Sequence, residues 1–166
     1  MQTHMCRTTF PTPLGRCAVS WHEAGLTGFE LPEAPVRAGD TSEPPAAIAA
    51  IIARVQRHLA GEPQDFSDLR YDFAEVPAFD LAVLRATLAV KSGQTRSYGE
   101  IATAIGQPLA ASRAVGSALG ANHWPLLIPC HRIVAADGRM TGFSGPGGIK
   151  TKLRLLALEG AQLFAE

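Results

Sequence analysis

The chain has 166 residues, of which 46% are hydrophobic and 18% charged, and its 15 Lys and Arg balance 15 Asp and Glu. This composition excludes an intrinsically disordered protein, and the length allows one ordinary domain or two small ones with a buried core. No apolar run approaches the roughly 20 residues that cross a membrane, and we expect no signal peptide, because the N-terminus lacks a basic start and an apolar stretch.

The first part of the chain predicts antiparallel strands followed by one helix. Residues 8–31 hold β-favouring runs separated by glycine-containing turns. Residues 32–45 are rich in proline and are expected to form a loop. Residues 46–59 repeat apolar side chains at helical spacing, and a glycine and a proline follow as stop signals. Residues 66–76 then form a short connector.

The second part predicts mainly helices. These helices are expected over residues 78–90, 98–105, 111–119 and 149–158, the last with Leu153, Leu156 and Leu158 as its apolar side. Ser97 is placed to cap the second of them, and Gly106-Gln107-Pro108 separates it from the third, so the two form a helix-turn-helix pattern. Short strands are expected at residues 126–128 and 133–135, the latter followed by a hairpin turn at Asp137-Gly138.

The segment Leu126-Leu127-Ile128-Pro129-Cys130-His131-Arg132 is the most informative part of the sequence. A thiolate is a better nucleophile than a thiol, and a base or a positive charge beside a cysteine lowers its pKa. An imidazole and a guanidinium directly follow Cys130, which we expect at the end of a buried strand. The segment predicts a reactive thiol, and the alternative is a buried, inert cysteine.

Glu159 follows the last predicted helix, at the end where the helix dipole disfavours a carboxylate. Either its side chain is exposed to solvent, or a cationic or proton-carrying partner holds it. We expect His131 to be that partner.

The helix over residues 111–119 has an unusually smooth surface, because small side chains dominate it. Such a surface can approach a nucleic-acid groove or a neighbouring helix, and the spacing favours neither. Arg113 is its one long cation and lies in the first turn, where the helix dipole is unfavourable. Residues 79–166 also carry nine Lys and Arg against five Asp and Glu, a balance that suits a polyanionic partner.

Several motifs of the second part occur together in one known family. They are Tyr98-Gly99-Glu100-Ile101-Ala102, Arg113-Ala114-Val115-Gly116, Asn122, Ile128-Pro129-Cys130-His131-Arg132-Ile133-Val134 and Leu156-x-x-Glu159-Gly160. In this order and spacing they resemble the O6-alkylguanine-DNA alkyltransferases, also called methylated-DNA–protein-cysteine methyltransferases. The resemblance is strong from Phe79 to Gly160 and weak before that.

The resemblance implies direct-reversal DNA repair by a suicide enzyme, a methylated-DNA–[protein]-cysteine S-methyltransferase. Cys130 would take the alkyl group from O6 of guanine, or O4 of thymine, and keep it. His131 would generate the thiolate through a water molecule, Glu159 would orient and charge-balance that imidazole, and Asn122 would fix the turn holding the cysteine. No cofactor is implied.

The resemblance also implies a DNA interface. The partner would be double-stranded DNA containing O6-alkylguanine, approached from the minor groove by the second helix of the helix-turn-helix, with the damaged base flipped out. Arg113 would occupy the space of that base. The residues expected at the DNA are Tyr98, Arg113, Ala114, Gly116 and Ser117, and those around the base are Tyr98, Leu119, Phe143 and Ser144.

For the fold, the resemblance implies an α+β chain of two small domains. Residues 1–77 are expected to form an antiparallel sheet with a helix, similar to ribonuclease H. Residues 78–166 are expected to form a mainly helical, winged-helix-like domain with the helix-turn-helix. We expect a monomer without membrane contact, and a cytoplasmic or nuclear location, since three cysteines without framework spacing indicate a reducing compartment.

The chain departs from the family pattern around the expected pocket. Phe143 stands where Tyr is frequent, and the loop over residues 144–150 is longer than the commonest form. Some relatives bind zinc in the N-terminal domain. Here Cys6, Cys17 and His22 lack tight ligand spacing, so no metal site is expected.

Two other functions fit part of the pattern. A small-molecule cysteine hydrolase or transferase would use Cys130, His131 and Glu159 but would need neither the smooth helix nor the basic half. A protein that binds alkylated DNA without reacting would share the DNA surface, but such relatives usually lack the cysteine. A hydrolase turns over repeatedly, whereas an alkyl acceptor stops after one equivalent.

Overall fold

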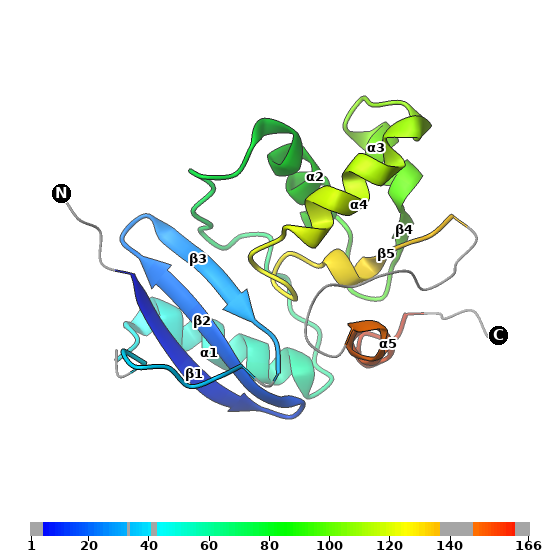
Figure 1. Cartoon of the computed structure of the whole chain (residues 1–166). Coiled ribbons are helices and arrows are strands. Elements are labelled where there is room, and N and C mark those ends of the chain that lie inside the picture. The colour runs from blue at the N-terminus through cyan, green and yellow to red at the C-terminus, as the bar shows by residue number, and fades with distance from the viewer. Residues whose placement is uncertain (1–4, 33, 41–42, 137–147, 162–166) are drawn as a thin grey trace.

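A three-stranded antiparallel sheet with one long helix forms one side of the molecule, and shorter helices form the other (Figure 1). The computed structural model describes residues 5–32, 34–40, 43–136 and 148–161. The chain therefore combines α-helices with an antiparallel β-sheet, as expected of an α+β fold. None of the helices within these ranges is long and apolar enough to span a membrane.

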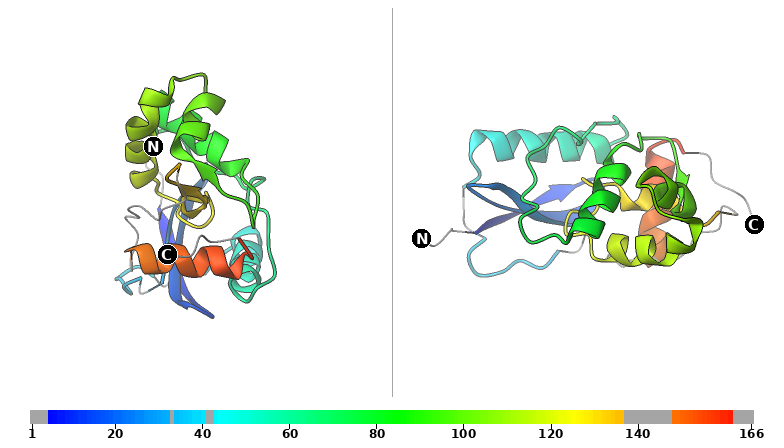
Figure 2. Two further views of the ribbon diagram at one scale, coloured as in Figure 1. Left: turned by 90° about the vertical axis from the view of Figure 1, so that its right-hand side faces the viewer. Right: turned by 90° about the horizontal axis from the view of Figure 1, so that it is seen from above.

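The sheet has the order β1-β2-β3, with β1 at Cys6–Thr12, β2 at Gly15–His22 and β3 at Gly25–Glu30. The predicted antiparallel strands are thus confirmed. Helix α1, Ala46–Leu59, lies along the sheet and has the predicted bounds (Figure 2). The helix forms because its apolar side chains recur at helical spacing and are buried together: Ile48, Ile51, Val55 and Leu59.

The second part contains α2 (Ala78–Leu88), α3 (Tyr98–Ala104), α4 (Ser112–Gly120) and α5 (Gly148–Leu158). A small parallel pair, β4 (Arg96–Ser97) with β5 (Ile133–Val134), ties α3 to the chain after the cysteine. Ser97 caps α3 as predicted: its Oγ accepts from the Glu100 N–H at 3.0 Å, while the Glu100 carboxylate accepts from the Ser97 N–H at 2.8 Å.

The hydrophobic core joins the two sides of the molecule. Its larger cluster contains sheet and α1 residues together with Leu84, Trp124, Leu155 and residues 126–128. The Trp124 indole N–H also donates to the Leu26 carbonyl of β3 at 3.0 Å. A second cluster packs α2, α3 and α4 around Cys130 and Ile133. The cysteine therefore lies where the two clusters meet.

The prediction of a strand over residues 126–128 is wrong. This segment is a turn closed by a single bridge between Pro125 and Ile128, and the Ile128 N–H donates to the Trp124 carbonyl at 2.8 Å. Leu126 has φ +79°, a left-handed conformation that a strand excludes. Three buried apolar residues imitate a strand in the sequence, but their backbone hydrogen bonds stay within the turn. The hairpin expected at Asp137-Gly138 lies outside the described residues.

The β2–β3 hairpin gives a stability prediction. Gly25 has φ +134°, and a Cβ there would lie 2.5 Å from the Arg70 carbonyl oxygen, which accepts the Leu26 N–H at 2.8 Å. Gly61 has φ +102° with no atom within 4 Å of an added Cβ. Both alanine variants strain the backbone, but only Gly25→Ala also creates a steric overlap with the Arg70 carbonyl oxygen. We expect Gly25→Ala to cost about 2 kcal/mol more than Gly61→Ala in urea unfolding. Equal costs would contradict this.

Candidate active site

The loop after α4 is held in shape by one amide side chain. Asn122 Nδ2 donates to the Ile128 carbonyl at 3.0 Å, and Asn122 Oδ1 accepts from the Trp124 N–H at 2.9 Å. The side chain thus replaces the ladder hydrogen bonds that a strand would have supplied. The loop leads into a short 3₁₀ helix, Cys130–Arg132, which begins at the cysteine.

Cys130 is 8% exposed and lies at the start of this 3₁₀ helix. Burial raises the pKa of its thiol, although the Asn122 side chain, the Lys152 charge and two backbone N–H groups act in the opposite direction. Neither the His131 nor the Arg132 side chain is among the groups that lower this pKa. Adjacent in sequence, these two side chains are directed at Glu159 instead.

Glu159 is a buried carboxylate that four hydrogen bonds hold. The Arg132 guanidinium binds it through two N–H groups, Nε to Oε1 at 2.9 Å and Nη2 to Oε2 at 2.8 Å. Oε2 is also 2.9 Å from His131 Nε2 and 2.8 Å from His58 Nε2. Burial would raise the pKa of Glu159, but these donors outweigh it and hold the pKa well below its usual range. His131 is thus at the carboxylate, as expected, together with two further partners.

His131 is fully buried, and its two ring nitrogens have different surroundings. Nε2 faces Glu159, whereas Nδ1 has no hydrogen-bond partner within the described residues. Burial lowers the pKa of His131 and outweighs the opposite effect of Glu159. The ring is therefore neutral near pH 7, with Nε2–H donating to the carboxylate and the Nδ1 lone pair able to accept a proton.

Two buried polar residues near the site were not identified from the sequence. His58 lies in the last turn of α1, three residues after the buried Val55. This helical spacing was the sequence signal that could have predicted its burial. Lys152 is 1% exposed, and its Nζ donates to the Ile133 carbonyl at 2.7 Å and lies 5.9 Å from the Tyr98 ring centre. Burial lowers the pKa of this ammonium group.

The expected apolar side of the last helix also needs correction. Leu153, Leu156 and Leu158 were expected to form it, whereas α5 buries Lys152, Leu155 and Leu156. The helix is rotated so that the Lys152 ammonium reaches a carbonyl inside the molecule. A lysine is assigned to the surface by its charge, and nothing in the sequence reveals the buried carbonyl.

Helix α4 packs through one side and exposes the other. Val115, Ala118 and Leu119 are buried in the second core cluster. The exposed side carries Arg113, Ala114 and Ser117. Gly116 is half-buried beside the Tyr98 ring, and a Cβ added at this glycine would lie 3.8 Å from the nearest ring carbon. The small residues thus serve both packing and an open surface. Phe143 and Ser144 lie outside the described residues.

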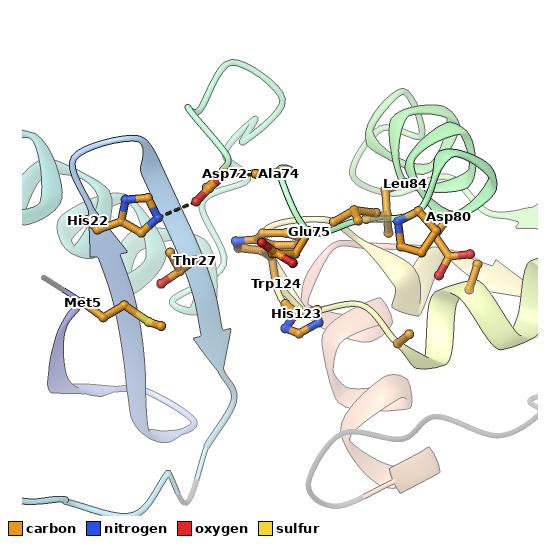
Figure 3. A pocket seen from close by; sticks show the side chains of 14 residues that line it. Met5, His22, Thr27, Asp72, Ala74, Glu75, Asp80, Leu84, His123 and Trp124 are labelled. Atoms are coloured by element: carbon orange, nitrogen blue, oxygen red, sulfur yellow. Dashed lines mark hydrogen bonds and ion pairs between the residues drawn. The ribbon is translucent and has the colours of Figure 1, made fainter. Parts of the chain in front are cut away.

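A separate cavity of about 360 Å³ is lined in part by Trp124 (Figure 3). Its wall includes His22 and Thr27 of the sheet, Asp72 of the connector and His123, but not Cys130. His22 is hydrogen-bonded to Asp72.

No group of three or more His, Cys, Asp or Glu that could hold a metal is found in the described ranges. Cys17 is buried in β2, where burial raises its pKa to about 12.

Comparisons with known proteins place this site in context. Residues 78–161 match the family model for the DNA binding domain of 6-O-methylguanine DNA methyltransferase. The chain is 36% identical to the methylated-DNA–protein-cysteine methyltransferase of Mycobacterium tuberculosis H37Rv, covering 95% of this chain and 94% of the relative. It is 38% identical to a DNA base-flipping protein of Thermus thermophilus, covering 91% and 97%.

The fold agrees with a solved structure. The crystal structure of Mycobacterium tuberculosis OGT in complex with DNA superposes with a TM-score of 0.78 at 36% identity, covering 92% of each chain.

The buried carboxylate gives a prediction on stability. Glu159→Gln should lower the free energy of unfolding at pH 7 by about 3–5 kcal/mol, because the Arg132 charge stays buried without its partner. The folded-state pKa of Glu159 lies below the unfolded value, so its contribution is present above the unfolded pKa and fades as the pH falls below about 5. The difference in the free energy of unfolding between wild type and variant should therefore become smaller in acid. Exposed Glu62→Gln is the control, and a gap independent of pH would contradict a charged Glu159.

Proposed function

Because the chain belongs to the O6-methylguanine-DNA methyltransferase family, and is thus a methylated-DNA–protein-cysteine methyltransferase that repairs DNA by direct reversal, we propose that Cys130 accepts the alkyl group. The observation that carries this assignment is the buried contact between Glu159 and His131, the residue directly after Cys130. The carboxylate fixes the imidazole so that the Nδ1 lone pair remains available as a base.

The residues around Cys130 divide the chemistry among them. His131 takes the thiol proton, through a water molecule, and the thiolate attacks the alkyl carbon on O6 of guanine. A sulfur–carbon bond forms while the carbon–oxygen bond breaks, and its electron pair stays on the guanine, which takes up one proton. Glu159 balances the imidazolium that forms, and Asn122 with the backbone N–H groups at the start of the 3₁₀ helix stabilises the thiolate.

The acceptor is consumed in this reaction. The product is a thioether, whose carbon–sulfur bond does not hydrolyse under mild conditions, so each protein molecule repairs one base. Because the sulfur itself receives the alkyl group, no cofactor is needed. The same attack applies to O4-alkylthymine, which presents an alkyl carbon on an exocyclic oxygen.

Helix α4 is the element proposed to enter the minor groove of double-stranded DNA. Its exposed side is small apart from Arg113, which suits close approach of a backbone to the groove. Cys130 is too buried to reach a base within a duplex, so the damaged guanine must leave the stack, and Arg113 takes its place. A relative solved in complex with DNA and another named a DNA base-flipping protein support this part of the proposal.

The flipped base is proposed to lie near the α3–α4 junction. Tyr98 and Leu119 border the cluster that contains Cys130, and the Lys152 charge lies behind the Tyr98 ring. Phe143 and Ser144, which lie outside the described residues, are proposed to complete the pocket, one as an apolar wall and the other through its backbone N–H. Ala114, Gly116 and Ser117 remain the surface that meets the DNA.

The finer fold assignment is part of the same proposal. Residues 1–77 would form a ribonuclease H-like domain and residues 78–166 a winged-helix-like domain, in a protein that acts as a monomer. The family model begins to match at residue 78, which supports the boundary. The larger core cluster nevertheless contains residues from both sides of that boundary.

Stoichiometric methylation of Cys130 tests the proposed function. After incubation with duplex DNA containing O6-methylguanine, the tryptic peptide with Cys130 should gain one CH₂ unit, and repaired guanine should plateau at one per protein. Cys6 and Cys17 serve as internal controls. Repeated turnover would instead favour a hydrolase, and binding without transfer would favour a non-reactive DNA-binding protein.

Arg113→Ala tests base flipping separately from chemistry. The variant should repair duplex DNA at least tenfold more slowly than wild type, yet react with free O6-benzylguanine at the wild-type rate, because only the duplex requires extrusion. Arg57→Ala, which removes an exposed cation on α1, controls for loss of positive charge. A proportional loss on both substrates would mean that Arg113 has a structural role.

A further inference from the structure

The carboxylate behind the proposed base also binds a residue of the N-terminal helix. His58 Nε2 lies 2.8 Å from Glu159 Oε2, although 101 residues separate the two in sequence. Both side chains are almost completely buried. Figure 2 shows the end of α5 beside the end of α1, where these residues lie. The contact therefore links the sheet side of the molecule directly to the alkyl-acceptor site.

The protonation state of His58 follows from its second nitrogen. The Gln64 N–H donates to His58 Nδ1 at 3.0 Å, so Nδ1 carries a lone pair. Since the ring is then neutral, the proton must be on Nε2, which donates to Glu159. The Phe66 ring, with its centre 5.5 Å from that of His58, packs beside the imidazole. His58 is thus a fixed, neutral donor.

Three donors share one carboxylate oxygen. Glu159 Oε2 receives hydrogen bonds from His58 of α1 and from His131 and Arg132 of the cysteine segment. Each donor withdraws negative charge from Oε2. The oxygen then attracts the proton of any other donor less strongly. The more strongly His58 donates, the less the carboxylate favours the imidazolium form of His131.

We propose that His58 is a positioning residue for alkyl transfer, which holds Glu159 in the orientation that leaves His131 neutral, with its Nδ1 lone pair available to accept the thiol proton. This inference rests on the proposed roles of Cys130 and His131. The charged and titratable groups that bear on it are Glu159, His131 and Arg132 at the carboxylate, and Lys152 beside the thiol. The N-terminal part then contributes to the reaction, beyond supporting the fold.

The test compares two substitutions that differ in one property. His58→Leu fills the space but removes the donor, whereas His58→Gln retains an N–H group of similar reach. Val55→Ala is the matched control, because it weakens α1 at a buried position one turn earlier in the same helix. Single-turnover methyl transfer from saturating O6-methylguanine duplex is measured against pH, and the His131 ring is titrated by imidazole ¹⁵N NMR.

We expect the acid limb of the rate profile to move to higher pH in His58→Leu, because His131 then protonates more readily and must be neutral to act as the base. In that limb the rate should fall about tenfold, the effect of losing one charge-assisted hydrogen bond. His58→Gln and Val55→Ala should retain the wild-type profile.

Two results would overturn the inference. One is a wild-type profile in His58→Leu, and the other is an equal shift in Val55→Ala, which would indicate general loosening of α1. The NMR titration reports on His131 without any reaction, so it tests His58 even if Cys130 is not methylated. Failure of methyl transfer in the wild-type protein would contradict the proposed function alone.

Discussion

A carboxylate buried at the end of a helix is the constraint on which the site depends. Glu159 follows α5, where the helix dipole repels negative charge, and burial adds a large desolvation cost. Such a group is stable only when donors surround it, and the guanidinium of Arg132 and two imidazoles supply them. Because the carboxylate follows α5 and its donors come from α1 and from the cysteine segment, satisfying one charge fixes these three segments relative to one another.

The same arrangement reconciles a buried thiol with its reactivity. Burial raises the pKa of Cys130, so the resting sulfur is a thiol and resists oxidation and stray alkylation. An acceptor that is used once gains from such protection, since every side reaction removes a molecule. In the proposed mechanism the thiolate forms only when His131 takes the proton, and Glu159 makes that transfer favourable without lowering the thiol pKa beforehand.

The sequence was most informative where the pattern was local. The apolar spacing of residues 46–59 predicted α1, and Ser97 with Glu100 predicted the cap of α3. It failed at residues 126–128, where three apolar residues imitate a strand although the Asn122 side chain, six residues before Ile128, holds them in a turn. His58 and Lys152 were missed because their partners are distant in sequence and cannot be inferred from one chain. The pairing of Glu159 with His131 was found only because a carboxylate at that helix end is unfavourable and requires a partner.

The contact between His58 and Glu159 also bears on what the physical unit of the protein is. The family model covers residues 78–161, which would suggest that the DNA-binding part is complete by itself. The larger core cluster, however, contains Trp124 and Leu155 together with residues of the sheet and α1. Removing the N-terminal part would expose this apolar surface and leave Glu159 without one of its donors. The two proposed domains therefore share one core cluster, in which the sheet and α1 pack with the loop that precedes the cysteine.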